Sequence, residues 1–305
     1  MKVLHINDIA GVSCVLAKYQ QINGIESKVL SSNTIDKYGI LKFYKDYVNL
    51  VDPINFVDYC ISEAKTADII HIHSNEALVF RIRKACGNSK KIILHYHGTD
   101  IRGFKTKKNS EISVIQNLNN IKKLFTHKIK NRIWLIKKGY YHSFSMESQK
   151  LANEILVATP DLLSLVPYAH YLPNPIDSDH FSKVNDNRIR SNNNALTIHT
   201  ETGDIKKTLQ YCKTNNISIK INVYDRTKKP LLYEEIPNFL KKYDIYVDIR
   251  MLNDKILENY SKTALESLSC GLKVLNYKLE YIDKLPEEHH PLNVVNQLQN
   301  IYNKI

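Results

Sequence analysis

Short apolar runs alternate with longer amphipathic stretches along the first half of the chain. The apolar runs are Lys2–Asn7, Ser27–Leu30, Asp68–His73, Lys91–His95 and Glu154–Ala158. Continuous apolar runs of this length are typical of strands that are buried on both faces of a sheet. The stretches between them carry a helical pattern, and the alternation of strands with helices predicts a parallel, doubly wound α/β domain.

This alternation is interrupted near the middle of the chain by two closely spaced prolines, Pro173 and Pro175. Neither a helix nor a central strand accommodates such a pair, so we place an interdomain linker at about residues 173–180. A second α/β series follows, with strands at Leu196–His199, Ser218–Tyr224, Asp244–Ile249 and Lys273–Tyr277, and with helices from Ile205, near Glu234–Lys242, at Ser261–Cys270 and over residues 292–305. The sequence therefore predicts two domains, 1–175 and 176–305.

Composition narrows the class of protein. The 305 residues are 43% hydrophobic and 24% charged, values typical of a globular chain with a substantial core. Five cysteines are scattered without a C-x-x-C pair, which argues against a disulfide framework or a zinc site and favours a reducing, cytoplasmic setting. The first residues have a strand pattern rather than that of a signal peptide, and no apolar run has the length of a membrane-spanning helix.

The net charge of +12 is concentrated in one segment. Residues 101–140 contain eleven Lys or Arg and a single acidic residue, Glu111. Apolar residues recur there at helical spacing: Ile121, Phe125, Ile129, Ile133, Ile136 and Tyr140. Cationic amphipathic segments lie in the interface of anionic bilayers, so we expect residues 101–140 to bind an anionic membrane surface. The alternative is a core helix whose lysines face water.

Two glutamates, Glu258 and Glu266, are separated by seven residues near the C-terminus. The second lies in a predicted helix that ends at Gly271 and precedes an apolar strand. Thr263 and Glu266 have the T-x-x-E spacing of a capping box, which requires no ligand. The free N–H groups and the dipole at the start of such a helix also favour a phosphate group. Both interpretations stay open, because a phosphate-binding helix also needs a cap.

Other candidate residues follow predicted strands. Gly11 comes after the first strand and allows the backbone to approach a ligand closely, although a tight strand-to-helix turn needs a glycine equally. It is not part of a G-x-G-x-x-G motif, which argues against a nicotinamide cofactor. His97 also lies just after a strand, where open α/β sheets bind ligands. We interpret its turn as exposed, because Gly98 and Asp100 lie within it.

Taken in their order along the chain, these elements resemble retaining glycosyltransferases of family 4. The spacing of Glu258 and Glu266 resembles the Glu-x7-Glu signature of that family. Other matching segments are the first strand with its glycine loop, residues 68–73, residues 97–100, residues 158–161 and residues 172–177. The resemblance covers nearly the whole chain and points to a compact archaeal or bacterial branch. It implies a GT-B fold, in which two Rossmann-like, doubly wound domains face a central cleft.

The resemblance also implies roles for individual residues. The catalytic candidates are His97, which contacts the donor sugar, Glu258, which faces that sugar, and Glu266, which holds the nucleotide ribose. The donor-binding candidates are Gly11, Lys206, Arg226, Ser261, Lys262 and Thr263. Lys206 stands in for a family lysine that holds the pyrophosphate. No clear counterpart of the family arginine is present, and Arg226 is the candidate to supply its charge.

No metal or other cofactor is expected, because a helix N-terminus and a cation stabilise the leaving diphosphate by themselves. The side chain of Lys262 either provides that cation or simply faces solvent. Asp177 and Asp179 form a D-x-D pattern that binds metal in a different glycosyltransferase fold, but here it lies in the linker and is interpreted as a coincidence. His71 and His73 are interpreted as packing residues, since the spacing places no third ligand beside them.

The predicted function is transfer of a sugar, with retention, from a nucleotide-sugar donor to a glycan or lipid-linked glycan. We expect a cytoplasmic protein that binds the cytoplasmic membrane face peripherally. Three alternatives stay open: an inactive nucleotide-sugar-binding relative, a sugar-nucleotide epimerase, and a nucleic-acid-binding protein that uses residues 101–140. No nucleic-acid partner is expected, because that segment carries no recognised nucleic-acid-binding motif.

Overall fold

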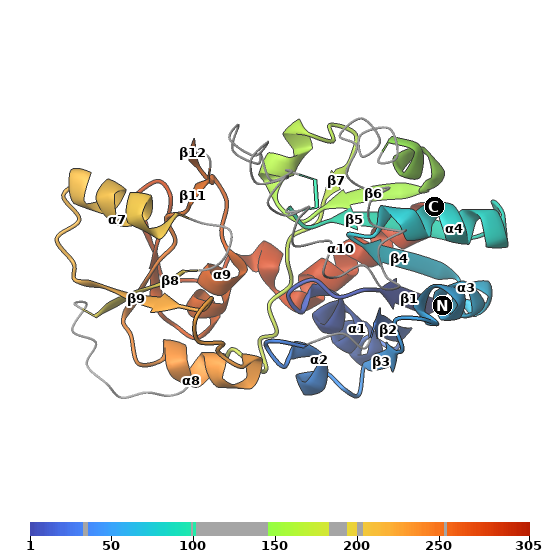
Figure 1. Ribbon diagram of the computed structural model, residues 1–305, viewed down its shortest axis with the longest axis horizontal. Coiled ribbons are helices and arrows are strands. Elements are labelled where there is room, and N and C mark those ends of the chain that lie inside the picture. Colours follow the sequence, from blue (N-terminus) through green and yellow to red (C-terminus); the bar gives the residue numbers. More distant parts are fainter. Residues whose placement is uncertain (33–35, 99, 102–145, 183–193, 200–203, 253–254) are drawn as a thin grey trace, which may run out of the picture.

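The computed structural model describes residues 1–32, 36–98, 100–101, 146–182, 194–199, 204–252 and 255–305. These residues form two α/β domains that lie side by side, each built on its own sheet (Figure 1). The predicted α/β class is therefore confirmed. The expected amphipathic segment 101–140 lies outside the described residues, apart from Ile101. Among the helices of the described part of the chain, none combines the length and the apolar character that a membrane span needs.

The first domain contains a seven-stranded parallel sheet with the order β3-β2-β1-β4-β5-β6-β7. Its strands are β1 (Lys2–Ile6), β2 (Glu26–Ser32), β3 (Val48–Val51), β4 (Ile69–His73), β5 (Lys91–Tyr96), β6 (Glu154–Val157) and β7 (His170–Tyr171). The chain winds outward in opposite directions from β1, so the order reverses between β1 and β4. In open parallel sheets, ligands bind beyond the carboxyl ends of the strands at this reversal point.

Helices cover both faces of this sheet. They are α1 (Val12–Ile22), α2 (Ile40–Phe43), α3 (Phe56–Thr66) and α4 (Glu76–Cys86), with a 3₁₀ turn η2 (Pro160–Ser164). Alternate residues of each strand point to opposite faces. Val3 and Ile69 accordingly pack in the core under α1, whereas Leu4 and Ile70 pack in the core under α3 and α4.

The second domain contains a five-stranded sheet with the order β14-β13-β10-β8-β9, in which β14 alone is antiparallel to its neighbour. Its strands are β8 (Ala195–His199), β9 (Ile221–Asp225), β10 (Ile245–Val247), β13 (Lys273–Leu275) and β14 (Tyr281–Ile282), and β11 (Met251–Leu252) pairs with β12 (Lys255–Ile256). Its helices are α7 (Ile205–Thr214), α8 (Ile236–Leu240) and α9 (Lys262–Ser269), with 3₁₀ turns η3 (Tyr233–Glu235) and η4 (Glu287–His289). Here the strand order reverses between β8 and β10.

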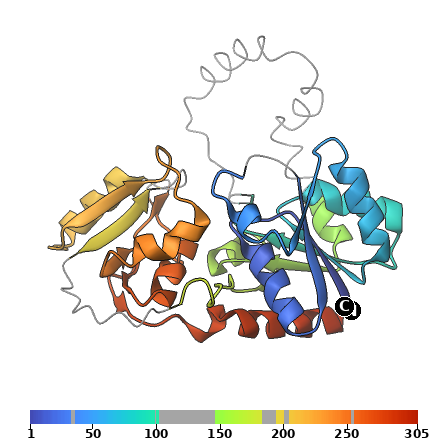
Figure 2. The same ribbon diagram turned by 90° about the horizontal axis from the view of Figure 1, so that it is seen from below.

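The last helix, α10 (Pro291–Lys304), returns to the first domain and packs against α1 (Figures 1 and 2). Its apolar stripe is fully buried there: Val294, Val295, Leu298 and Tyr302. The predicted division at 175/176 assigns this helix to the second domain by its position in the sequence. Its contacts join it to the first domain instead, because an amphipathic helix is stabilised where its apolar face is buried.

Candidate active site

The start of α9 lies at the carboxyl end of the second sheet. Ser261 is the N-cap of this helix: its backbone is extended, and its hydroxyl oxygen accepts a 3.0 Å hydrogen bond from the N–H of Ala264. The capping box predicted for Thr263 and Glu266 is therefore wrong, because Thr263 already lies inside the helix. Asp248 holds the backbone of this N-cap residue in place, because its Oδ2 accepts a 2.8 Å hydrogen bond from the N–H of Ser261.

Lys262 and Glu266 form a nearly buried ion pair on α9. The Nζ of Lys262 lies 3.0 Å from Oε1 of Glu266, and the two side chains are 14% and 4% exposed. The ammonium group also lies 5.1 Å from the ring centroid of Tyr233. Burial alone lowers the pKa of Lys262, but Tyr233 and Glu266 outweigh it, and the pKa lies above its ordinary value. Lys262 is therefore a fixed cation, which excludes the solvent-facing alternative.

The glycine loop of the first domain faces this ion pair. Gly11 has a positive φ of 83°, and a Cβ atom placed on it would lie 3.3 Å from Nζ of Lys262 and 3.8 Å from Oη of Tyr233. Asp8 holds the loop, because its carboxylate accepts 2.6 Å hydrogen bonds from the N–H of Gly11 and from the hydroxyl of Ser13. Gly11 therefore allows the two domains to approach each other directly at Lys262.

Arg250 is a functional candidate that the sequence analysis missed. It follows β10, and its Nε lies 3.1 Å from Oδ1 of the fully buried Asp248. Its guanidinium also donates to the backbone and side-chain oxygens of Asn259. With Ser261 and Thr263 it lines a cavity of about 80 Å³ beside the start of α9. Its position just beyond a strand was the available signal, since ligand-binding residues gather there in such sheets.

The remaining donor-side candidates are more dispersed. Arg226 lies over the ring of Tyr38 in the first domain, 4.1 Å from the ring centroid, and donates to the carbonyl of Leu231. Lys206 is exposed in the first turn of α7, and Glu258 is exposed between β12 and α9. The structure thus brings Gly11, Ser261, Lys262 and Glu266 together, places Thr263 at the adjoining cavity, and holds Arg226 on Tyr38.

His97 lies just beyond β5, as predicted, but it is half-buried rather than exposed. Asp100 fixes its loop by accepting hydrogen bonds from the N–H groups of His97 (2.9 Å) and Gly98 (2.6 Å). The Nε2 atom of His97 lies 2.9 Å from Nδ1 of His73. Burial lowers the pKa of His97 to about 4, against the opposing effects of Asp100 and Asp8, so its imidazole is neutral at pH 7.

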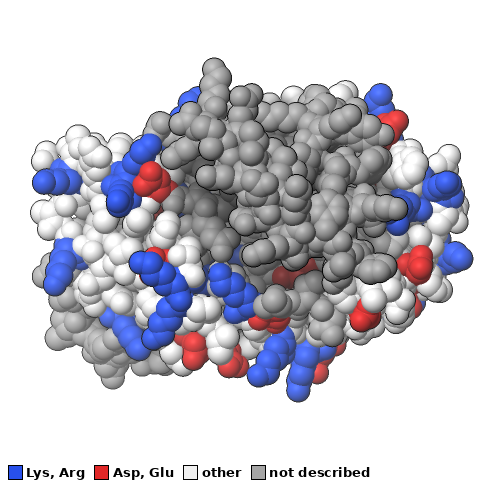
Figure 3. All heavy atoms as spheres, viewed as in Figure 1, with Lys and Arg blue, Asp and Glu red and all other residues white. Residues whose placement is uncertain are grey.

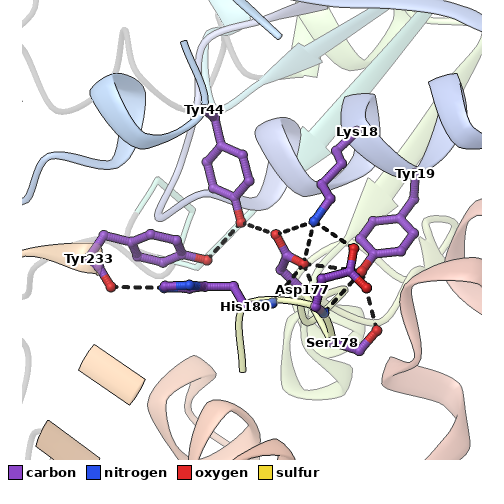
Figure 4. Close-up of polar contacts among 8 residues, drawn as sticks. Lys18, Tyr19, Tyr44, Asp177, Ser178, His180 and Tyr233 are labelled. Atoms are coloured by element: carbon purple, nitrogen blue, oxygen red, sulfur yellow. Dashed lines mark hydrogen bonds and ion pairs between the residues drawn. The ribbon is translucent and has the colours of Figure 1, made fainter. Parts of the chain in front are cut away.

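Asp177 joins the linker to the first domain (Figure 4). Its buried carboxylate lies 2.8 Å from Nζ of Lys18 and accepts hydrogen bonds from the hydroxyls of Tyr19 (3.1 Å) and Tyr44 (2.8 Å). Burial alone raises the pKa of Asp177, but these partners outweigh it, and the pKa lies below its usual value. Tyr44 continues the network to Tyr233 across the domains, at 3.0 Å.

We expect Tyr44→Phe to lower the free energy of unfolding by about 1.5–3 kcal/mol, the range for a hydrogen bond to a charged group. The ring keeps its packing, but the buried carboxylate of Asp177 loses one donor. Urea unfolding of both proteins measures the difference. The control is Tyr59→Phe, because the side chain of Tyr59 is exposed. Equal losses in both variants would contradict the role of Asp177 in holding the linker to the first domain.

Comparison with solved structures identifies the fold. Protein-family models find no match in the chain. No curated protein matches the sequence. Similar solved structures include an alpha-glucosyltransferase in complex with UDP and a 13-mer DNA (TM-score 0.55, 12% identity, covering 99% of this chain and 88% of that one). HepE of Anabaena in complex with UDP is also similar, with a TM-score of 0.51 and 9% identity, covering 100% of this chain and 91% of that one. The sucrose-phosphate synthase of Thermosynechococcus elongatus has a TM-score of 0.55 and 8% identity, covering 99% of this chain and 91% of that one. The fold is GT-B, as predicted.

Proposed function

We propose that this protein is a glycosyltransferase that moves a sugar from a nucleotide-sugar donor to an acceptor. One observation carries the proposal: Lys262 at the start of α9 faces the Gly11 loop of the other domain. This place lies beyond the carboxyl ends of both sheets, where open α/β folds bind ligands. The complexes of the alpha-glucosyltransferase and of HepE with UDP support a nucleoside diphosphate as the donor moiety.

In this proposal the donor diphosphate binds at the start of α9. The first turn of a helix offers N–H groups without intrahelical partners, and its dipole favours an anion. Lys262 adds a fixed positive charge, and Arg250 adds a second beside the adjoining cavity. Arg250 replaces Arg226 as the proposed arginine, since Arg226 is held on Tyr38. These groups neutralise the charge that develops on the leaving diphosphate, so the reaction needs no metal.

The remaining roles follow the resemblance to family 4 and its retaining reaction. Glu266 holds the ribose with the carboxylate oxygen that is not paired with Lys262, and Glu258 faces the sugar. Lys206, exposed at the start of α7, reaches the diphosphate from the second domain. Neutral His97 hydrogen-bonds the donor sugar from the first domain. The acceptor, a glycan or lipid-linked glycan, binds near Gly11.

A thermal-shift screen of nucleotide sugars and nucleoside diphosphates tests the proposal. A ligand that binds only the folded state raises the melting temperature, by an amount that grows with its concentration over Kd. We expect one nucleoside diphosphate series to stabilise the wild type, and Lys262→Gln to abolish that shift. Lys284→Gln is the control, because Lys284 is exposed in the second domain. No shift with any ligand would contradict the proposal, and a shift without turnover would identify an inactive relative.

We expect His97→Ala to lower turnover at least roughly tenfold, a loss of about 1.4 kcal/mol of transition-state stabilisation. The reason is the loss of a neutral hydrogen-bonding group close to the reacting sugar. Steady-state kinetics with the donor found in the screen measure the effect. His170→Ala is the control, since His170 is exposed and pairs with Glu154 at the far edge of the sheet. Unchanged turnover in His97→Ala would remove His97 from the site.

We also propose that the protein binds the cytoplasmic membrane face peripherally through residues 101–140. Each basic residue close to an anionic bilayer contributes about 1 kcal/mol. On the face seen in Figure 3, the Lys and Arg side chains of the described residues are spread over both domains among acidic ones. Because residues 101–140 are strongly basic, we expect the protein to co-sediment with acidic-lipid vesicles at low salt. Charge reversal at Lys122, Lys123, Lys137 and Lys138 should weaken this binding. Salt-sensitive retention on DNA without vesicle binding would favour the nucleic-acid alternative.

A further inference from the structure

Five histidines lie together on one face of the first sheet. His5 lies on β1, His71 and His73 on β4, and His95 on β5, and His97 follows β5. The strand register makes them neighbours, since His5 pairs with His71 and His73 pairs with His95. Adjacent rings lie between 4.3 and 5.3 Å apart. The first four are at most 1% exposed, which is unusual for so many titratable side chains.

Hydrogen bonds fix the direction of one chain of imidazoles. Gln20 Oε1 accepts from Nε2 of His5 at 2.8 Å, so Nδ1 of His5 is an acceptor. Nε2 of His73 therefore donates to it at 3.1 Å, and Nδ1 of His73 accepts from His97 at 2.9 Å. This chain of neutral rings ends at His97, the member of the cluster that is partly open to solvent.

A second arm of the cluster ends at an unsatisfied atom. The hydroxyl oxygen of Tyr302 lies 3.0 Å from Nδ1 of His71, and Nε2 of His71 lies 3.2 Å from Nδ1 of His95. The Nε2 atom of His95 is buried, and among the described residues it has no hydrogen-bond partner. A buried polar atom without a partner costs about 1–3 kcal/mol, so its retention calls for an explanation such as an ion.

The geometry around this atom suits a metal. His73, His95 and His97 each offer one ring nitrogen, and these atoms all lie within 4.8 Å of one another. Neutral imidazole nitrogens are common ligands of zinc, at about 2.0–2.1 Å, so three of them around one ion lie roughly 3.3 Å apart. His97, half-buried at the strand end, provides the path of entry.

We propose that His73, His95 and His97 form a binding site for a divalent transition-metal ion, with zinc as the expected occupant. In metal sites, the ring nitrogen of a histidine ligand that does not bind the ion makes a hydrogen bond that orients the ring. A bound ion replaces the hydrogen bond between Nε2 of His97 and Nδ1 of His73, and the His97 proton then lies on its Nδ1. His73 keeps its hydrogen bond to His5 through Nε2, and Asp100 holds the loop of His97 through the backbone. The site shares His97 with the proposed donor site, but its test measures metal binding rather than turnover, so the failure of one proposal is distinguishable from the failure of the other.

Equilibrium dialysis of the full chain against buffered Zn²⁺, followed by elemental analysis, tests the proposal. We expect one zinc ion per wild-type chain, and an affinity at least about tenfold lower in His97→Ala. His97→Ala is the preferred variant because the partly exposed ring is removed with little effect on the core. Co²⁺ substitution in the wild type should give the strong visible absorption of a tetrahedral nitrogen-rich site, a measurement that needs no variant.

Two control variants and one discriminating variant identify the ligands. His170→Ala removes an exposed histidine and His289→Ala a buried one outside the cluster, and both should bind zinc as the wild type does. His5, His71 and His73 form a second group with similar spacing. Wild-type affinity in His97→Ala together with loss in His5→Ala would overturn the assignment in favour of that inner group. Failure of the wild type to bind zinc, or equal losses in His97→Ala and His170→Ala, would overturn the site altogether.

Discussion

Replacement of Glu266 with glutamine is expected to lower turnover at least about 100-fold while the protein stays folded, a loss of about 2.7 kcal/mol of transition-state stabilisation. Glutamine has nearly the same shape, and its amide oxygen still accepts a hydrogen bond from Lys262. The variant loses the negative charge that holds Lys262 at the Gly11 loop and that, in our proposal, binds the ribose hydroxyls. Both losses weaken the binding of the donor, whereas the packing of the hydrophobic core is unchanged.

Steady-state kinetics and thermal unfolding of the same preparations separate these effects. Glu234→Gln is the control, because Glu234 is exposed in η3. A double-mutant cycle with Lys262→Gln measures the coupling of the pair, since residues in contact give non-additive effects. Full turnover in a folded Glu266→Gln variant would mean that the reacting donor lies elsewhere in the cleft.

The parallel α/β class was within reach of the sequence because its signals are local, whereas the GT-B arrangement was implied by the resemblance to family 4. Buried strands of five or six residues, such as β4 and β5, are visible as largely apolar runs, and their alternation with helices implies parallel pairing. The short strands β3 and β7 escaped notice, since two to four residues give too little pattern. The position of α10 also escaped notice, because an apolar stripe shows that a helix is buried but not against which domain.

The candidate site likewise contains parts that a local sequence pattern predicts and parts that it does not. Ser261 and Glu266 could be predicted to lie on one helix, because the stretch before Gly271 has a helical pattern with a capping signal. The contact between Gly11 and Lys262 depends on how the two domains meet, which no local pattern encodes. The histidine cluster is an intermediate case. His71 and His73 are visible as an alternating pair, but their meeting with His5 and His95 requires the strand order and register.

Acidification from pH 7 to pH 5 is expected to destabilise the protein by at least about 2 kcal/mol, the contribution of His5 alone. Burial lowers the pKa of His5 to about 4, below its ordinary value of 6.5, although Gln20 and Asp8 oppose the shift. As the pH falls below 6.5, the unfolded chain takes up a proton that the folded chain does not. Stability is therefore complete above pH 6.5 and is lost as the pH approaches 4. His71, His73 and His95 shift in the same direction.

Chemical unfolding at pH 7 and pH 5, with a chelator present to exclude bound metal, measures this loss. The window lies above the ordinary pKa of carboxyl groups, near 4, so it reports mainly on histidines. His5→Gln should reduce the difference between the two pH values by about 2 kcal/mol, because one shifted group is removed. His170→Gln should leave the difference unchanged, since the side chain of His170 is 65% exposed. Equal unfolding free energies at both pH values in the wild type would mean that the histidine cluster is protonated, or open to water, in the folded protein.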